Sequence, residues 1–503
     1  MGVVFRQSVK TSLVTFAGAF LGAFIIWLST NYIPKQQLGF TRSLTSQAIL
    51  LSNFVFLGCG NVLIVYIHRF ANSIAKKRLL ITLCLLVPLV TTGIASIAYF
   101  LFRSQIVHHF QPEDVPLMQQ YFALLPIYTL LFSGMTMLEL YLGTQMKVAV
   151  SAFMREVIVR VINIILILLF AFHYISFSTL VAGTVLMYAV PVGLFFYLSS
   201  STENFGLSVR FSDFSMAEYK EMIHFSWYHF LLVITITIMS IMDILLLPFY
   251  DHKGLSSVAV YGVAVFIISF LQIPYKAMST STFAVLTQAF NNKDIVKAKD
   301  IFTRSSINML IATTGITLLI WCNLGNVVGV IKNDYQDVIP VFSILLIGRF
   351  IDLSTGVNDT VLTITNYYKF NVYLSAVLVA VLYLLIRFMV PVYGIFGAAW
   401  STTITLILFN IAKYIFVWKK LDMQPYSGKT ILILLSGACA FAAGYFFPHL
   451  FSEVRHIYIH AFLDTALRSV AIITVYVAML LWLKPSNDLQ EYISSVKKNK
   501  RLF

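Results

Sequence analysis

Long apolar segments recur along almost the whole chain, and short polar gaps separate them. As a helix, each segment is long enough to cross ~30 Å of hydrocarbon, which takes ~20 residues. The pattern therefore predicts an all-α integral membrane protein with about fourteen transmembrane helices. The predicted spans are 11–33, 44–67, 79–102, 117–142, 148–172, 176–199, 222–249, 256–289, 304–331, 338–365, 370–391, 394–417, 429–448 and 459–483.

The basic residues are unevenly divided between the two sides of these spans. Of the 35 Lys and Arg residues, 23 occupy every second gap. Short cytoplasmic loops retain Lys and Arg whereas exported loops lose them, so the sequence predicts cytoplasmic termini and an even number of spans. The opposite side holds only Lys35, Arg42, Arg103, Lys253, Lys332, Arg387, Arg455 and Arg468.

Composition narrows the possible functions. The chain is 59% hydrophobic and 11% charged, whereas soluble proteins contain about 25% charged residues. Its net charge of +14 is spread over loops that would face anionic lipid headgroups, so no nucleic-acid partner is expected. The four cysteines lie in predicted spans without the spacing of a zinc site or a disulfide framework, and no metal or cofactor is expected.

The first six spans and the next six share a rhythm at an offset of roughly 215–220 residues, which indicates an internal repeat. Because six is even, the two halves would share one orientation and be related by a pseudo-two-fold axis along the membrane normal. Ser215 and Glu218 have the spacing of a capping box, which predicts a helix start before the seventh span. The predicted domains are an N-terminal lobe 1–200, a cytoplasmic connector 201–221, a C-terminal lobe 222–420, and two further helices with a basic cytoplasmic tail in 421–503.

One stretch resembles a known family. Residues 260–274 (VYGVAVFIISFLQIP) lead into 287–294 (TQAFNNKD) within two six-helix lobes plus two helices. This resembles the polysaccharide-export (O-antigen or oligosaccharide flippase) branch of the multidrug/oligosaccharidyl-lipid/polysaccharide (MOP) flippase superfamily. The resemblance implies that undecaprenyl-diphosphate-linked oligosaccharide is translocated across the bacterial inner membrane by alternating access. The candidate partners of such a transporter are a proton or sodium ion, which a carboxylate inside a span could bind, and the polymerase of the same export pathway.

Two cations are candidates for binding the diphosphate of such a lipid. Arg349 lies near the middle of the tenth span, where a charge costs at least ~2.5–3.5 kcal/mol. Asp352 and Asp359 share its helix stripe, so Arg349 either pairs with Asp352 or faces the cleft as a bidentate phosphate ligand. Lys276 follows Pro274 in the eighth span, which the resemblance places along the cavity; the alternative is a side chain that reaches to the cytoplasmic interface.

Further charges lie in the N-terminal lobe and the seventh span. Glu139 and Arg155 are about equally distant from the turn at Met146, so they can pair across the hairpin. Arg160 has the i,i+4 spacing of a helix ion pair with Glu156. The alternative for Arg155 and Arg160 is substrate binding.

Carboxylates inside the spans are candidates for ion coupling. Asp243 has no basic residue at i±3 or i±4, which makes it either a coupling-ion site or a side chain with an unrecognised partner. Asp359 and Glu139 are the other ion-coupling candidates.

Three alternative functions remain. A cation-coupled multidrug antiporter would typically have twelve spans and a cleft rich in carboxylates. A lipid II flippase would share the helix count, but its first helices carry Arg-containing motifs, whereas 13–28 holds no charge here. A polytopic glycan polymerase or ligase would need a large exported loop, and no exported gap exceeds about fifteen residues. The sequence therefore favours a transporter over an enzyme.

Overall fold

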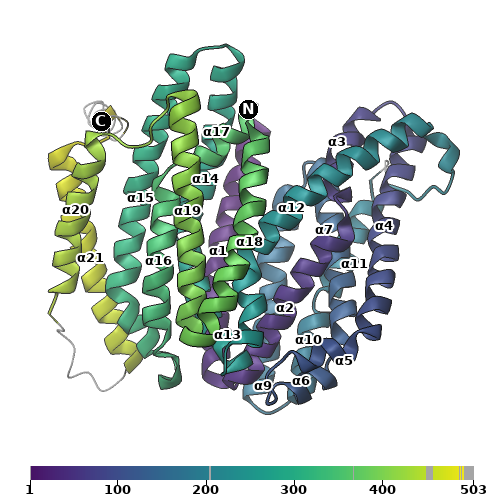
Figure 1. Cartoon of the computed structure of the whole chain (residues 1–503), viewed down its shortest axis with the longest axis horizontal. Coiled ribbons are helices and arrows are strands. Elements are labelled where there is room, and N and C mark those ends of the chain that lie inside the picture. The colour runs from purple at the N-terminus through teal and green to yellow at the C-terminus, as the bar shows by residue number, and fades with distance from the viewer. Residues whose placement is uncertain are drawn as a thin grey trace. The chain divides into compact units, whose positions relative to one another are not determined.

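The computed structural model describes residues 2–202, 205–365, 367–448, 457–486, 488 and 490–491. Within these ranges every regular element is a helix, and the predicted all-α class is confirmed. The chain divides into two compact units, Met1–Gly262 (unit 1) and Val263–Phe503 (unit 2), which are coloured along the chain in Figure 1. Of the basic tail predicted after the last span, residues 492–503 lie outside the described residues.

Unit 1 holds the first half of the helices. They are α1 (Gly2–Tyr32), α2 (Lys35–Phe56), α3 (Cys59–Arg69), α4 (Ile74–Leu101), α5 (Arg103–His108), α6 (Val115–Gln120), α7 (Leu124–Thr144), α8 (Val148–Phe153), η1 (Met154–Ile158), α9 (Val159–Ala171), α10 (Phe177–Leu186), α11 (Ala189–Ser200), η2 (Phe211–Asp213), α12 (Met216–Tyr250) and the first part of α13 (Gly254–Ser269).

Unit 2 holds the rest of α13 and the helices that follow. They are α14 (Gln272–Asn291), α15 (Ile295–Gly329), η3 (Asn333–Tyr335), α16 (Val338–Ser354), α17 (Asn358–Ile364), α18 (Tyr368–Tyr393), α19 (Ile395–Leu421), α20 (Gly428–Tyr445) and α21 (Ile457–Leu483).

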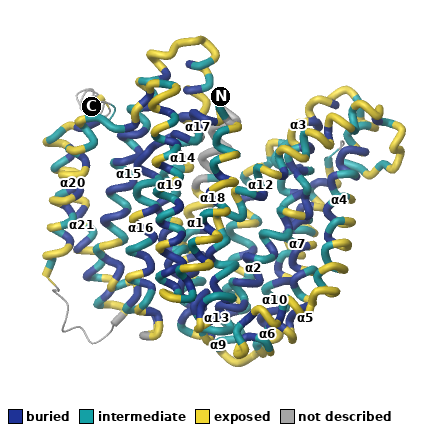
Figure 2. Tube along the Cα trace, viewed as in Figure 1, coloured by how far each residue is buried: buried dark blue, intermediate teal, exposed yellow. Residues whose placement is uncertain are grey.

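The helices are those of a multi-pass membrane protein. Among the described residues, ten are long and apolar enough to cross a membrane, or up to 13 if each of three bent pairs counts as one span. The fifth predicted span, 148–172, is divided among α8, η1 and α9, none of which is long enough alone. Exposed positions run along α20 and along the second half of α4 (Figure 2), and many are large apolar side chains such as Leu101, which is 74% exposed. Apolar surface of this kind suits lipid.

The second predicted span is broken between α2 and α3 by 46°. Leu57 and Gly58 at the break both have positive φ, of 47° and 80°. A Cβ on Gly58 would lie 2.2 Å from the carbonyl oxygen of Ser226 on α12, so only glycine fits both the backbone and the contact. The Ser226 hydroxyl donates a hydrogen bond to the Leu57 carbonyl, which the break leaves without its helical partner.

Two further spans are bent. α13 and α14 meet at 49°, and Pro274 is the third residue of α14, where a proline costs no helical hydrogen bond. α16 and α17 meet at 47° across Gly356, whose φ is +72°. A Cβ on Gly356 would lie 2.1 Å from the Ser306 hydroxyl oxygen of α15, so this break is also fixed by packing.

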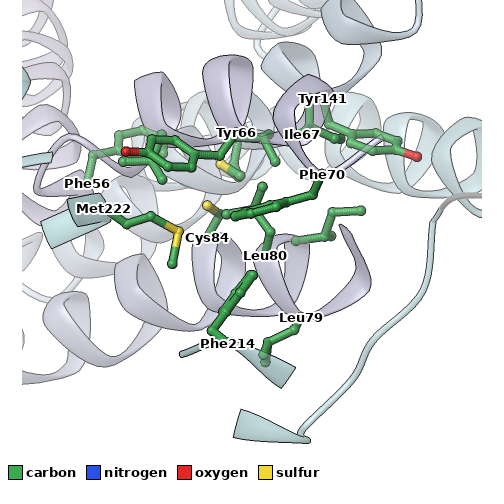
Figure 3. Close-up of a cluster of buried hydrophobic side chains, with 14 residues drawn as sticks. Phe56, Tyr66, Ile67, Phe70, Leu79, Leu80, Cys84, Tyr141, Phe214 and Met222 are labelled. Atoms are coloured by element: carbon green, nitrogen blue, oxygen red, sulfur yellow. The ribbon is translucent and has the colours of Figure 1, made fainter. Parts of the chain in front are cut away.

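A buried apolar cluster joins α3, α4 and the start of α12 (Figure 3). Phe70, Leu80, Phe214 and Met222 lie in it with ten other side chains. The predicted capping box at Ser215 is confirmed: Ser215 accepts from the Glu218 backbone, and the Glu218 carboxylate accepts from Ser215. At the edge of the cluster, ion pairs join Lys76 to Glu218 at 2.6 Å and Arg69 to Glu221. The connector is therefore packed into unit 1.

At the other end of unit 1, Asp114 connects the start of α2 to the start of α13. Its Oδ2 accepts the backbone N–H of Leu255 at the start of α13, and its Oδ1 accepts from the Gln36 amide of α2, both at 2.8 Å. A Cβ on Gly254, which has a φ of +49°, would lie 2.1 Å from Asp114 Oδ2. Burial raises the pKa of the Asp114 carboxyl above its usual value, against the lowering effect of the two hydrogen bonds.

Candidate functional site: charged side chains within the spans

In unit 2, a polar seam lies between α16 and α19. The helices approach closely at Gly348, where an added Cβ would be 2.9 Å from Thr403 Cα. One turn after Gly348 on α16, the Asp352 carboxylate accepts hydrogen bonds from Arg349 Nη1 and from Asn410 Nδ2, both at 2.9 Å. The Asn410 carbonyl oxygen accepts from the Thr355 hydroxyl at 3.1 Å. The i,i+3 pair that the sequence predicts between Arg349 and Asp352 is present.

A second ion pair continues the seam across the α16–α17 break. Lys413 of α19 donates to both carboxylate oxygens of Asp359 at 3.1 Å, and its ammonium lies 3.8 Å from the centroid of the Phe409 ring. The two partners differ in burial: the Lys413 side chain is 2% exposed and that of Asp359 is 41% exposed. The lysine is thus enclosed by protein, whereas one side of the carboxylate remains accessible.

Arg349 keeps unused hydrogen-bonding capacity. Its Nε is buried and has no hydrogen-bond partner among the described residues, although Nη1 is paired with Asp352. Tyr275 of α14 lies within electrostatic range of Arg349, Asp352 and Asp359. The next residue, Lys276, is exposed. Unit 2 therefore places two ion pairs, Arg349–Asp352 and Lys413–Asp359, along one seam, and Tyr275 of α14 lies within electrostatic range of both carboxylates.

Unit 1 contains a separate group of four charges. Arg155 Nη1 lies 3.1 Å from Glu139 across the α7–α8 hairpin, and its Nε lies 3.3 Å from Glu156. Arg160 pairs with Glu156 at 2.6 Å. Both ion pairs predicted from the sequence are present. Arg155, at 49% exposed, is the most accessible of the four.

The group is shaped by a π-helical turn and by α1. Residues of η1, Met154–Ile158, carry Arg155 and Glu156, and such turns occur often at functional sites. Arg160 also donates to the Gly18 carbonyl of α1. A Cβ on Gly18 would lie 2.9 Å from Glu156 Cβ, so glycine allows α1 to reach the ion pair.

Asp243 has a buried partner. Its Oδ2 accepts from the Tyr261 hydroxyl of α13 at 2.6 Å, and its Oδ1 accepts the backbone N–H of Ile244. Beside Tyr261, a Cβ on Gly262 would lie 2.4 Å from Arg42 Nη1, so a guanidinium of α2 lies against this part of α13. Asp243 is therefore not isolated in the fold, although no basic residue lies three or four positions from it on its own helix.

The sequence analysis missed several members of these networks. The count of basic residues assigned Lys413 to a cytoplasmic gap, and Arg42 and Arg468 to exported ones. All three lie inside helices, and Lys413 is 1% exposed. Arg468 pairs with Asp464 at 2.9 Å on α21. Lys413 could have been recognised because it falls within its own predicted span and follows Asn410 by three residues; Tyr261 gave no signal. The described residues hold no group of three side chains suited to a metal ion.

The comparisons with known proteins bear on the fold. No protein-family model and no curated protein sequence matches the chain. Among solved structures, it is similar to the lipid II flippase MurJ in an inward closed conformation, with a TM-score of 0.71 and 16% identity over 94% of this chain and 100% of that one.

Two multidrug transporters are also similar. An inward-facing MATE family transporter of the MOP superfamily gives a TM-score of 0.63 and 14% identity over 82% of this chain and 98% of that one. The MATE transporter DinF-BH in complex with R6G gives 0.58 and 16% over 83% and 95%. The chain therefore has the transporter fold that MurJ and the MATE proteins share.

Proposed function

We propose that this protein is a flippase that moves undecaprenyl-diphosphate-linked oligosaccharide from the cytoplasmic to the outer leaflet of a bacterial inner membrane, with both termini cytoplasmic. The transporter fold supports translocation by alternating access. The family resemblance of residues 260–274 and 287–294 supports the lipid-linked saccharide as substrate.

The observation that carries this proposal is the unpartnered Nε of Arg349. Asp352 occupies Nη1, so the Nε and Nη2 edge of the guanidinium is the edge left for a diphosphate. Because Nε is buried in this structure, the cleft has to open before a phosphate can reach that edge. Two parallel N–H···O bonds from this edge suit a phosphate, and arginine stays charged in the membrane interior. Lys276 would add a second cation from α14.

The charges around Arg349 also suit an anionic headgroup. The central spans of unit 2 carry three cations, Lys276, Arg349 and Lys413, against two carboxylates, Asp352 and Asp359. In unit 1, Arg155 and Arg160 are balanced by Glu139 and Glu156. We therefore assign headgroup binding to Arg349 and Lys276 of unit 2, and keep Arg155 and Arg160 as a separate substrate-binding candidate of unit 1, where Arg155 is 49% exposed.

The coupling ion would be a proton or sodium. Asp359 is one candidate because 41% of its side chain is exposed while Lys413 holds it in place. Asp243 and Glu139 are the other candidates. Each of the three already has a hydrogen-bonding or ionic partner, so ion binding there would compete with an existing contact.

Two other transport functions have support of their own. The likeness to MurJ covers 100% of that chain, which supports a lipid II flippase as an alternative function. The likeness to MATE proteins, together with the accessible carboxylate of Asp359, favours a cation-coupled drug antiporter. The excess of cations over carboxylates that Lys276, Arg349 and Lys413 give to the central spans of unit 2 favours the anionic lipid substrate over the drug.

The test is flipping of a fluorescent undecaprenyl-diphosphate oligosaccharide by the full chain in proteoliposomes. Arg349→Ala is expected to abolish flipping. Arg349→Lys should retain only part of the activity, because an ammonium cannot form the bidentate hydrogen bonds that a guanidinium makes with a phosphate. The matched control is Arg304→Ala, since Arg304 forms only exposed ion pairs, with Asp300 and Asp488, which contribute little to stability.

Three outcomes would count against the proposal. Normal flipping by Arg349→Ala would remove the assigned headgroup site. Equal transport of lipid II and the oligosaccharide lipid would favour the broader flippase, and gradient-driven efflux of a cationic dye without lipid flipping would favour the antiporter. In cells, a deletion strain should accumulate the lipid-linked oligosaccharide in the inner leaflet.

A further inference from the structure

A cavity of about 370 Å³ lies where α4 ends and α5 and α6 follow. These short helices lie at the end of unit 1 opposite α3 (Figure 1). Arg103, Ser104, His108 and Gln119 provide its polar lining, and Phe100 and Leu101 provide an apolar edge. The count of basic residues assigns this end to the outer side of the membrane, where Arg103 is one of few cations.

Arg103 is held in place but not neutralised. Its Nη2 donates to the Gln119 backbone carbonyl at 3.2 Å, and its guanidinium carbon lies 5.5 Å from the centroid of the Phe122 ring. Arg103 forms no ion pair with any residue in the described part of the chain. A cation fixed by a carbonyl and a ring, with donors left over, is suited to an anion.

His108 presents a second group to the same cavity. Its Nδ1 lies 2.7 Å from the Ser104 carbonyl oxygen, which can only accept, so Nδ1 carries the hydrogen. Nε2 has no hydrogen-bond partner among the residues that the structure describes. Arg103, Ser104 and His108 lie on one short helix and converge on a single space.

An apolar stripe leads along α4 to this cavity. Ile94, Ile97 and Leu101 are 63%, 64% and 74% exposed, and their spacing of three and four residues puts them on one face of the helix. Phe100, 48% exposed, borders both the stripe and the cavity. The stripe ends at the charged groups, which is the layout of a lipid chain below a polar headgroup.

We propose that this cavity binds the phosphate headgroup of a lipid in the outer leaflet, with the lipid chain along the α4 stripe. Arg103 supplies bidentate donors for the phosphate oxygens, and Ser104 and His108 supply further polar contacts. A free phosphate would use the same groups but leave the stripe unused. This inference rests on the proposed function only for the identity of the lipid. A diphosphate lipid that arrives after transport and a phospholipid both present phosphate oxygens to Arg103.

The experiment measures binding to the purified full chain in a non-ionic detergent by native mass spectrometry. The probes are dioctanoyl phosphatidic acid, dioctanoylglycerol and inorganic phosphate. The first should bind, and the other two should bind at least tenfold more weakly. Loss of a hydrogen bond to a charged group costs roughly 1.5–3 kcal/mol, so Arg103→Gln should weaken phosphatidic acid binding about tenfold or more.

Matched variants separate the two halves of the site. Arg103→Lys should retain part of the affinity, and Ile97→Glu should weaken the lipid without changing the binding of inorganic phosphate. The control is Lys332→Gln, which removes an exposed cation from unit 2 and should leave binding unchanged. A normal melting temperature for each variant excludes unfolding as the cause.

Two results would overturn the proposal. Unchanged phosphatidic acid binding in Arg103→Gln would remove the headgroup site. Inorganic phosphate binding as tightly as phosphatidic acid would assign the cavity to a soluble anion instead. Neither result bears on flipping, because the flippase test depends on Arg349; conversely, loss of lipid binding here with intact flipping would leave the proposed function unaffected.

Discussion

Replacing Asp359 by Asn should destabilise the protein more than replacing its partner Lys413 by Met. The reason is the difference in burial between the two side chains, 2% exposed for Lys413 and 41% for Asp359. Asp359→Asn leaves an enclosed ammonium with only an amide and the Phe409 ring as neighbours. Lys413→Met leaves a carboxylate that water can reach, and a side chain of similar volume fills the space of the lysine.

The size of the effect follows from these environments. Removing one partner of a buried ion pair costs roughly 3–5 kcal/mol because the other charge loses its compensation. Exposed pairs contribute about 0–1 kcal/mol, and Lys413→Met should fall near the upper end of that range because Asp359 can hydrate. The double variant, Asp359→Asn with Lys413→Met, should therefore be more stable than Asp359→Asn alone by roughly 2–4 kcal/mol.

The assay is thermal unfolding of the four proteins in one detergent at one pH, followed by size-exclusion chromatography. The expected order of melting temperature is wild type, then Lys413→Met and the double variant, then Asp359→Asn. If Lys413→Met proves as damaging as Asp359→Asn, or if the double variant is the least stable, the argument from burial is wrong.

Three further predictions concern topology, coupling and pH. Reporter fusions should read cytoplasmic at Lys299 and periplasmic at His109; a reversed result at either position would break the even-span topology. Asp243→Asn should remove the dependence of flipping on an ion gradient, because Asn still accepts the hydrogen bond from the Tyr261 hydroxyl but cannot take up a proton. Tyr261→Phe removes only that hydroxyl and should keep the dependence. Equal effects of the two variants would indicate a structural role for Asp243. Because burial raises the pKa of Asp114, its stabilising contribution is complete below the unfolded pKa near ~3.9 and is lost as pH rises through the folded value. The melting temperature of wild type relative to Asp114→Asn should therefore fall as the pH is raised above about 4, and a rise would reverse the assigned direction.

Local spacing was sufficient to predict some of this structure. The capping box at Ser215 and the i,i+3 and i,i+4 pairs of Arg349 and Arg160 follow from helix geometry, and the structure contains all three. The apolar periodicity likewise predicted the helices, because a bilayer fixes their length.

What the sequence did not predict depends on partners distant along the chain. Counting basic residues between spans assigns Lys413 to a loop. Its ion pair with Asp359 becomes visible only when α19 packs against α17. Tyr261 looks like an ordinary apolar-helix tyrosine until α12 and α13 bring its hydroxyl to Asp243. The break at Gly58 has no helix-breaking proline, since it is fixed by the close approach of Ser226.

The packing of α12 has a consequence for dissecting the gene. The repeat in the sequence would assign α12 to the second half, yet Ser226 and Phe230 pack on Leu57, Gly58 and Phe54 of unit 1. A fragment ending in the 201–221 connector would therefore expose the Leu57 carbonyl and the glycine contact in its second span. Separately expressed halves should assemble better when the cut follows α12, so that the first fragment carries its own support.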